Sequence, residues 1–173
     1  SATNFFVGGT GQGTAAILFD PDRRASVTLQ EGATFDLRGV WTNGFLDSGD
    51  MSGIAHRDGG SVRLTSTHDV KLAGGSSIDV SSGAAILTNG NMLGGRGGDV
   101  SLLADVPNGR ISLGGQLTLD GDIRGYGVAG GGALTIQAGQ AVVIGGGSEV
   151  PGSSVAPSPA LNIDAERFRS GFS

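Results

Sequence analysis

The stretch "GGRGGDVSLL", from Gly94 to Leu103, places glycines beside an aspartate, a combination that can bind calcium. It approaches the calcium-binding nonapeptide G-G-x-G-x-D-x-U-x, where U is a large aliphatic residue. The four matching positions are Gly94, Gly95, Gly97 and Asp99. The U position falls on Ser101, and the motif occurs once, although calcium-binding turns share ions between tandem copies. The stretch therefore favours a tight corner that delivers Val100 and Leu102 into a core, with a calcium-stabilised binding module as an alternative.

Several aspartates could act on a polysaccharide if the fold brings them together. Asp47, Asp50 and Asp58 fall in one stretch, and Asp120 and Asp122 fall in another. Paired carboxylates act as acid and base in glycoside hydrolysis, or as calcium ligands. Aspartate in glycine- and serine-containing turns is also ordinary, because it accepts hydrogen bonds from its own backbone. We therefore expect a protein that is not an enzyme, and a polysaccharide lyase or hydrolase is an alternative.

Two histidines are present, His56 and His68, and a serine nucleophile would need one of them as its base. His56 lies beside Arg57 and Asp58, and His68 precedes Asp69 between two predicted strands. Both positions are typical of charged, solvated corners, so we expect no catalytic residues and no cofactor.

Three aromatic residues, Trp41, Phe45 and Tyr126, lie outside the predicted inward-facing positions. Exposed aromatic side chains stack on sugar rings or anchor protein partners. They can also fold back over an open sheet edge. These three residues are the candidate ligand contacts.

The composition limits the classes of protein to which the chain can belong. Of 173 residues, 34 are glycine, yet 38% are hydrophobic, which is too many for a flexible linker. The net charge is −5 and no basic cluster exists, which argues against nucleic acid as a partner. No apolar run reaches the roughly 20 residues that cross a bilayer, so no membrane insertion is expected. The absence of cysteine excludes disulfides.

A repeat organises these residues. In "GGSVRLTSTHDVKLAGGSSIDVSSG", apolar residues at i and i+2 recur every eight positions, which predicts short strands with one buried face. The same pairs occur in four sets of three. They are Ile17/Phe19, Val27/Leu29 and Phe35/Leu37; Val62/Leu64, Val70/Leu72 and Ile78/Val80; Val100/Leu102, Ile111/Leu113 and Leu117/Leu119; and Leu134/Ile136, Val142/Ile144 and Leu161/Ile163. Three short strands per turn, stacked turn on turn, predict an all-β fold, a parallel β-helix.

The intervals after the third pair of the first three sets predict side loops on one edge of a single repeat domain, residues 1–173, whereas in the fourth set the insertion comes before the third pair. The predicted loops span about 38–61, 81–99, 120–133 and 145–160. Insertions on one face of a repeat protein often form its binding face.

The phrases "GGSVRLTSTHDVKLAGGSSIDVSSGA" and "GGDVSLLA", with the ending "LNIDAERFRSGFS", resemble repeat segments of filamentous haemagglutinin-like exoproteins. These belong to the two-partner secretion system of Gram-negative bacteria. The resemblance implies a right-handed β-helical shaft, export across the outer membrane and a role in adhesion and virulence. It supplies no catalytic residues.

The sequence therefore predicts a shaft and interaction segment of a large secreted or cell-surface adhesin. We expect it to mediate cell attachment or aggregation. Its expected partners are glycans or proteins on host or bacterial surfaces, and neighbouring repeats of a much larger parent chain.

Overall fold

The computed structural model describes residues 25–46, 57–87, 89–107, 114–140, 142–144, 160–164 and 169–172. Within these residues the fold is all-β and contains no α-helix. The strands are β1 (Val27–Leu29), β2 (Thr34–Asp36), β3 (Thr42–Leu46), β4 (Val62–Thr65), β5 (Val70–Leu72), β6 (Ser77–Asp79), β7 (Ala84–Leu87), β8 (Met92–Gly94), β9 (Val100–Leu103), β10 (Leu117–Leu119), β11 (Asp122–Arg124), β12 (Leu134–Gln137), β13 (Val142–Ile144) and β14 (Leu161–Ile163).

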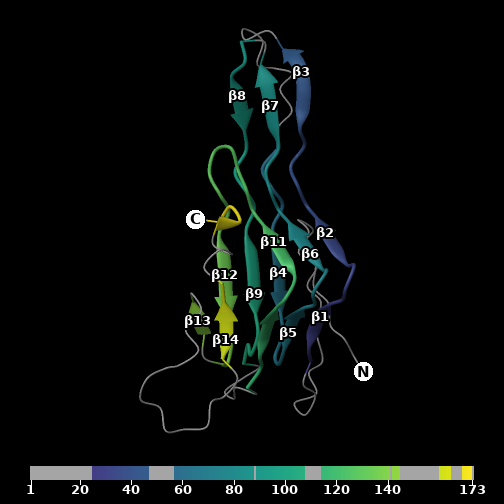
Figure 1. The fold of residues 1–173 in the computed structure, drawn as a ribbon, viewed down its shortest axis with the longest axis vertical. Coiled ribbons are helices and arrows are strands. Elements are labelled where there is room, and N and C mark those ends of the chain that lie inside the picture. The colour runs from purple at the N-terminus through teal and green to yellow at the C-terminus, as the bar shows by residue number, and fades with distance from the viewer. Residues whose placement is uncertain are drawn as a thin grey trace.

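Three parallel three-stranded sheets contribute side chains to one core. We call them sheet 1 (β4, β9, β12), sheet 2 (β1, β5, β10) and sheet 3 (β2, β6, β11). The chain visits them in this order, so that β4, β5 and β6 form one layer and β9, β10 and β11 form the next. Figure 1 shows the strands of sheet 3 side by side, β2, then β6, then β11.

The register of sheet 1 confirms the first predicted column of aliphatic residues. Val62 pairs with Val100, and Val100 pairs with Leu134, always in parallel. Residues two positions further on, Leu64 and Leu102, are also buried, as period-two strands require. The predicted pairs at the start of this column, Ile17 and Phe19, lie outside the described residues.

The predicted third and fourth sets are partly wrong. Leu117 was expected in the third column, but it pairs with Val70 in sheet 2, and Ile123 stacks on Ile78 in sheet 3. Ile123 is flanked by Asp122 and Arg124, so β11 has only one aliphatic residue and no i, i+2 pair to reveal it. The predicted side loop 120–133 therefore contains a sheet 3 strand.

In the fourth set, Val142 and Leu161 were assigned to successive columns, whereas β13 and β14 pair with each other in parallel. The predicted loop 145–160, apart from Ala160, lies outside the described residues. So do Ile111 and Leu113, the second pair of the third set.

A further sheet projects from one end of these layers, and we call it the arm sheet. Residues 38–61 and 81–99 contribute its strands, with β3 parallel to β7 and β7 antiparallel to β8. It extends beyond the core sheets at the top of Figure 1. Among the described strands, β7 and β8 are the one antiparallel pair.

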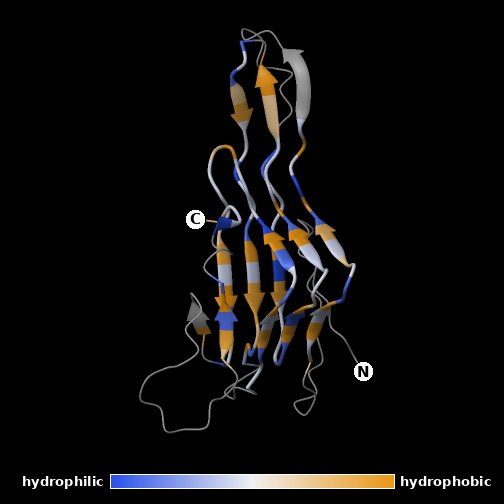
Figure 2. Cartoon of the chain, viewed as in Figure 1, coloured by the Kyte–Doolittle hydropathy of each residue, from blue (hydrophilic) through white to orange (hydrophobic). Residues whose placement is uncertain are grey.

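Aliphatic side chains from all three sheets share one core. The layer of β4, β5 and β6 is the most enclosed, because β5 and β6 each have a paired strand on both sides. Its residues Val70, Leu72, Ile78 and Val80 are fully buried. Figure 2 shows the same alternation, with apolar positions separated by polar ones along the core strands. Burying each such side chain contributes about 1.5–3 kcal/mol, so the repeated pairs are the main stabilising term.

Between the core and the arm sheet, backbone segments of neighbouring layers contact one another directly at glycines. We call these residues the glycine waist: Gly59, Gly60, Gly97, Gly98, Gly125 and Gly132. Here the chain leaving sheet 3 is hydrogen-bonded to the chain returning to sheet 1. Gly60 N donates to Leu37 O at 2.8 Å and Gly98 N donates to Val80 O at 2.8 Å. One layer further on, Gly132 N donates to Gly125 O at 3.1 Å. A Cβ at Gly98 would lie 1.8 Å from Gly60 O, so only glycine permits this approach.

Candidate binding face

The outer surface of sheet 3 carries the richest set of polar side chains among the described residues. Each strand of this sheet has a central apolar residue that faces the core, Phe35, Ile78 or Ile123. The flanking residues therefore point outward. The register places Thr34, Ser77 and Asp122 in one row, and Asp36, Asp79 and Arg124 in a second row.

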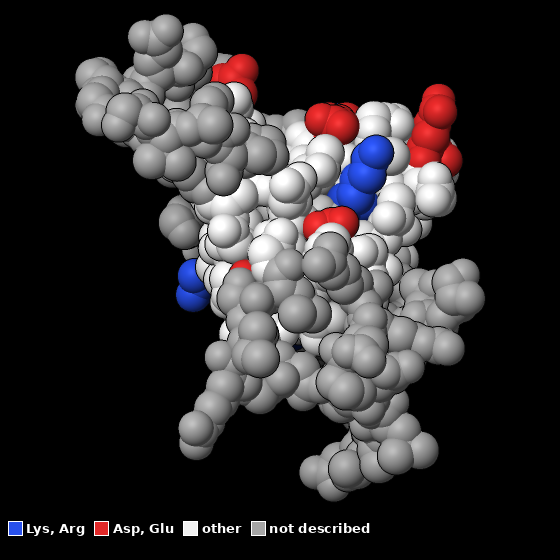
Figure 3. Space-filling model, turned by 90° about the horizontal axis from the view of Figure 1, so that it is seen from below, with Lys and Arg blue, Asp and Glu red and all other residues white. Residues whose placement is uncertain are grey.

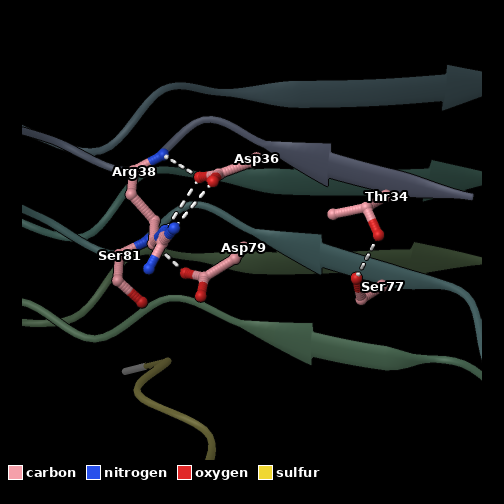
Figure 4. Close-up of polar contacts among 6 residues, drawn as sticks. All are labelled: Thr34, Asp36, Arg38, Ser77, Asp79 and Ser81. Carbon is pink, nitrogen blue, oxygen red and sulfur yellow. Dashed lines mark hydrogen bonds and ion pairs between the residues drawn. The ribbon is translucent and has the colours of Figure 1, made fainter.

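Arg38 organises the second row (Figure 4). Its Nε donates to Asp36 Oδ1 at 2.8 Å, and its Nη2 donates to Asp36 Oδ2 at 2.7 Å. Asp79 Oδ1 accepts the backbone N–H of Ser81 at 3.0 Å, and the hydroxyl groups of Thr34 and Ser77 lie 3.1 Å apart. The two rows thus combine short hydroxyl side chains in the first row with carboxylates held by hydrogen bonds in the second.

The Arg38 side chain, and then its backbone N–H, lower the pKa of Asp36 from 3.8 to about 2. Hydrogen bonding to Asp36 in turn raises the pKa of Arg38. A carboxyl that remains ionised throughout the neutral range is poorly suited to donate a proton as a general acid. Asp36 is suited to accept hydrogen bonds and to orient Arg38.

Replacing Arg38 by glutamine should return the pKa of Asp36 towards its ordinary value of 3.8, because the charged side-chain donor is lost. A carboxyl-carbon NMR titration of both proteins measures this shift directly. The folded-state pKa is depressed, so any stability from this pair is present above pH 4 and disappears as the pH falls towards 2. A titration midpoint unchanged by Arg38→Gln would contradict the proposed role of Arg38.

Two adjoining hollows run along this face. One has a volume of about 420 Å³ and lies over the strands of sheet 3, and the other, of about 680 Å³, lies at the end nearer the arm sheet. Arg38, Asp79 and Arg124 line both, so the hollows form one open groove. We call it the sheet 3 groove.

Trp41 and Tyr126 both line the second hollow, beside Val128. Their side chains are 56% and 52% exposed, so each presents a large aromatic surface to solvent. The structure therefore brings two of the three candidate contacts to one site. The side chain of the third, Phe45, lies outside the described residues.

Sequence reasoning missed the polar part of the groove. Asp36, Asp79 and Arg124 occupy equivalent positions of the three strands, directly after the inward residue. The detectable pattern was a charged residue directly after the inward residue in all three strands. It was not apparent because Ile123 was not recognised as an inward residue of sheet 3.

The remaining candidates have structural partners. Asp99 Oδ1 accepts the backbone N–H of Ala133 at 2.9 Å, and Asp58 Oδ1 accepts that of Arg96 at 2.7 Å. In both cases a carboxylate of one layer caps the next layer. No group of three or more potential metal ligands occurs in the part of the chain that the structure describes. Gly97 and Gly98 of the opening motif belong to the glycine waist.

His68 joins layers in a similar way. Its Nδ1 lies 2.9 Å from Asp69 Oδ2 and 3.5 Å from Ser26 Oγ, while Asp69 Oδ1 accepts the backbone N–H of Gln116 at 2.9 Å. A catalytic triad uses the two ring nitrogens separately, one for the acid and one for the nucleophile. Here both partners contact the same nitrogen, so the arrangement is not that of a triad.

The polysaccharide-active alternative required the aspartates of two loops to approach one another. Asp58 lies next to the glycine waist, whereas Asp122 lies on sheet 3, 3.8 Å from Arg124. Asp120 directly follows β10, at the opposite end of β11 from the waist. Asp47, Asp50 and His56 lie outside the described residues.

No protein-family model matches the chain, and neither a curated protein nor a solved structure does. Within the described residues, no helix has the length and hydrophobicity needed to cross a bilayer. In the view along the long axis, acidic and basic side chains of the described residues are interspersed with uncharged ones (Figure 3).

Proposed function

We propose that this chain is a shaft segment of a filamentous haemagglutinin-like adhesin, built as a right-handed parallel β-helix and exported to the cell surface by two-partner secretion. The supporting structural observation is the register of three parallel sheets around one core. The phrases of the sequence that resemble haemagglutinin-like repeat segments support the same proposal.

In this role each layer extends the shaft and also contributes to its lateral surface. Each layer covers the apolar edge of the previous one, which extends the shaft. Each layer also adds one outward row to its sides. The sheet 3 groove is the part of that lateral surface with both fixed charges and exposed aromatic rings, so we assign attachment to it.

The Asp36 carboxylate of the groove is better suited to binding a ligand than to cleaving one. Hydrolysis of a glycosidic bond needs a carboxyl with a raised pKa that can donate a proton. The carboxyl of Asp36 has the opposite character, because Arg38 lowers its pKa to about 2. This supports a surface that binds and orients, as expected of an adhesin.

Beads coated with the chain should adhere to epithelial cells or to bacteria. Trp41→Ala and Tyr126→Ala together should reduce adhesion at least tenfold, because they remove the exposed aromatic surface of the groove. Bead retention under flow measures the effect.

Met92→Ala is the matched control, since Met92 is 51% exposed but lies on β8 of the arm sheet. Its beads should adhere like wild type. Absence of wild-type adhesion would contradict the proposed function, and adhesion that survives loss of both aromatic residues would contradict the assignment of the groove.

A further inference from the structure

We infer that the ligand of the sheet 3 groove is an uncharged oligosaccharide. This inference rests on the proposed function, because it names the class of partner that the attachment surface takes.

The floor of the groove presents hydrogen-bonding groups in two in-register rows. Thr34 and Ser77 supply hydroxyl groups, and Asp36 and Asp79 supply carboxylate oxygens already fixed by Arg38 and by the Ser81 N–H. Acceptors that are already hydrogen-bonded and short hydroxyl side chains can pair with the many hydroxyl groups of a sugar at a small loss of side-chain entropy.

The aromatic end of the groove adds the second element of sugar recognition. Trp41 and Tyr126 belong to the first and third layers, two strand spacings apart, or about 10 Å across the sheet. That backbone separation is wider than one sugar ring. The occupant is therefore a chain of several sugar units lying across the strands, with its apolar ring faces on the aromatic side chains.

A peptide fits this face less well. Peptides commonly bind to sheets by adding a strand at a free edge. The groove instead lies over β6, which is paired with β2 on one side and β11 on the other. The backbone groups at its centre are already used.

The charges of the groove disfavour acidic sugars. Three carboxylates, from Asp36, Asp79 and Asp122, lie among two guanidinium groups, from Arg38 and Arg124. Arg38 is held by Asp36, and Arg124 lies 3.8 Å from Asp122. A polyanionic chain would meet net negative charge, and both guanidinium groups already have a carboxylate within 4 Å, whereas an uncharged chain would meet no such repulsion.

A glycan array that pairs neutral oligosaccharides with their sialylated, sulfated or uronate counterparts tests the inference. Wild type should bind neutral chains, and calorimetry on the strongest neutral ligand should show at least a tenfold loss of affinity for Trp41→Ala. Trp41→Phe should retain binding, and Met92→Ala should match wild type. Asp79→Asn with Asp122→Asn should improve binding to the acidic counterparts, because two negative charges are removed.

The outcomes separate the inference from the proposed function. Beads that adhere through Trp41 and Tyr126, with adhesion that survives enzymatic removal of cell-surface glycans, would mean a protein partner. That result overturns the inference and leaves the proposed function standing. Preference for acidic chains, or equal affinity of Trp41→Ala for the neutral ligand, would also overturn it. Absence of bead adhesion overturns the proposed function itself.

Discussion

A single methyl group at Gly98 is expected to lower the free energy of unfolding by about 3 kcal/mol or more. The Cβ of Gly98→Ala would lie 1.8 Å from Gly60 O, with the Gly60 and Gly59 carbonyl carbons also within 3 Å. All three atoms are backbone, so no side chain can rotate away, and two neighbouring layers must separate. Urea unfolding followed by far-UV circular dichroism measures the loss, and the melting temperature should fall by about 6–12 °C.

Gly74→Ala is the matched control for this prediction. Gly74 lies at an exposed corner between β5 and β6, where a Cβ would meet nothing within 4 Å. Its substitution should change the free energy of unfolding by less than about 0.5 kcal/mol. Equal destabilisation by the two substitutions would mean that the glycine waist does not depend on close backbone contact.

The second large effect is expected from Leu72→Ala, which should lower the free energy of unfolding by about 2–5 kcal/mol. Leu72 is fully buried in β5, the central strand of sheet 2, with Leu29 and Leu119 in register on either side. Neighbouring strands hold the backbone on both sides, so the cavity cannot collapse and its full cost is retained.

The same urea measurement with Lys71→Ala provides the comparison, because Lys71 lies on the same strand and points outward. We expect this change to stay within about 0.5 kcal/mol. A Leu72→Ala protein as stable as Lys71→Ala would show that sheet 2 does not enclose a common core.

The sequence was sufficient to predict the parts of the fold that repeat. Val62, Val100 and Leu134 could be aligned because each begins an i, i+2 aliphatic pair, and burial in a parallel sheet requires that spacing. This spacing cannot reveal a strand that has only one inward residue. Ile123 is such a residue, and its charged neighbours made β11 look like a loop.

The glycine waist was beyond sequence reasoning for a different reason. A glycine in a tight corner and a glycine touching another backbone leave the same letter in the sequence. Gly97 and Gly98 were interpreted as the first kind, but they are of the second kind. Only the position of the backbone segment that the glycine contacts, at Gly60 or Gly125, distinguishes the two kinds.

Of the candidate site, the aromatic residues could be predicted and the charged rows could not. Trp41 and Tyr126 are conspicuous because large aromatic residues are rare in this chain. Asp36 and Asp79 look like ordinary turn aspartates until the register places them side by side.

The hydrogen bonds of the glycine waist lie between the core sheets and the connections that project beyond them, including the arm sheet. The connection before β9 contains a whole β-hairpin, whereas the connection before β12 is short, yet both return to sheet 1 in the same register. Variation in these excursions is therefore absorbed before it reaches the aliphatic columns. Connections of different length can therefore leave the layers on one side, at intervals of one strand spacing of about 4.8 Å, without changing the register of the core strands.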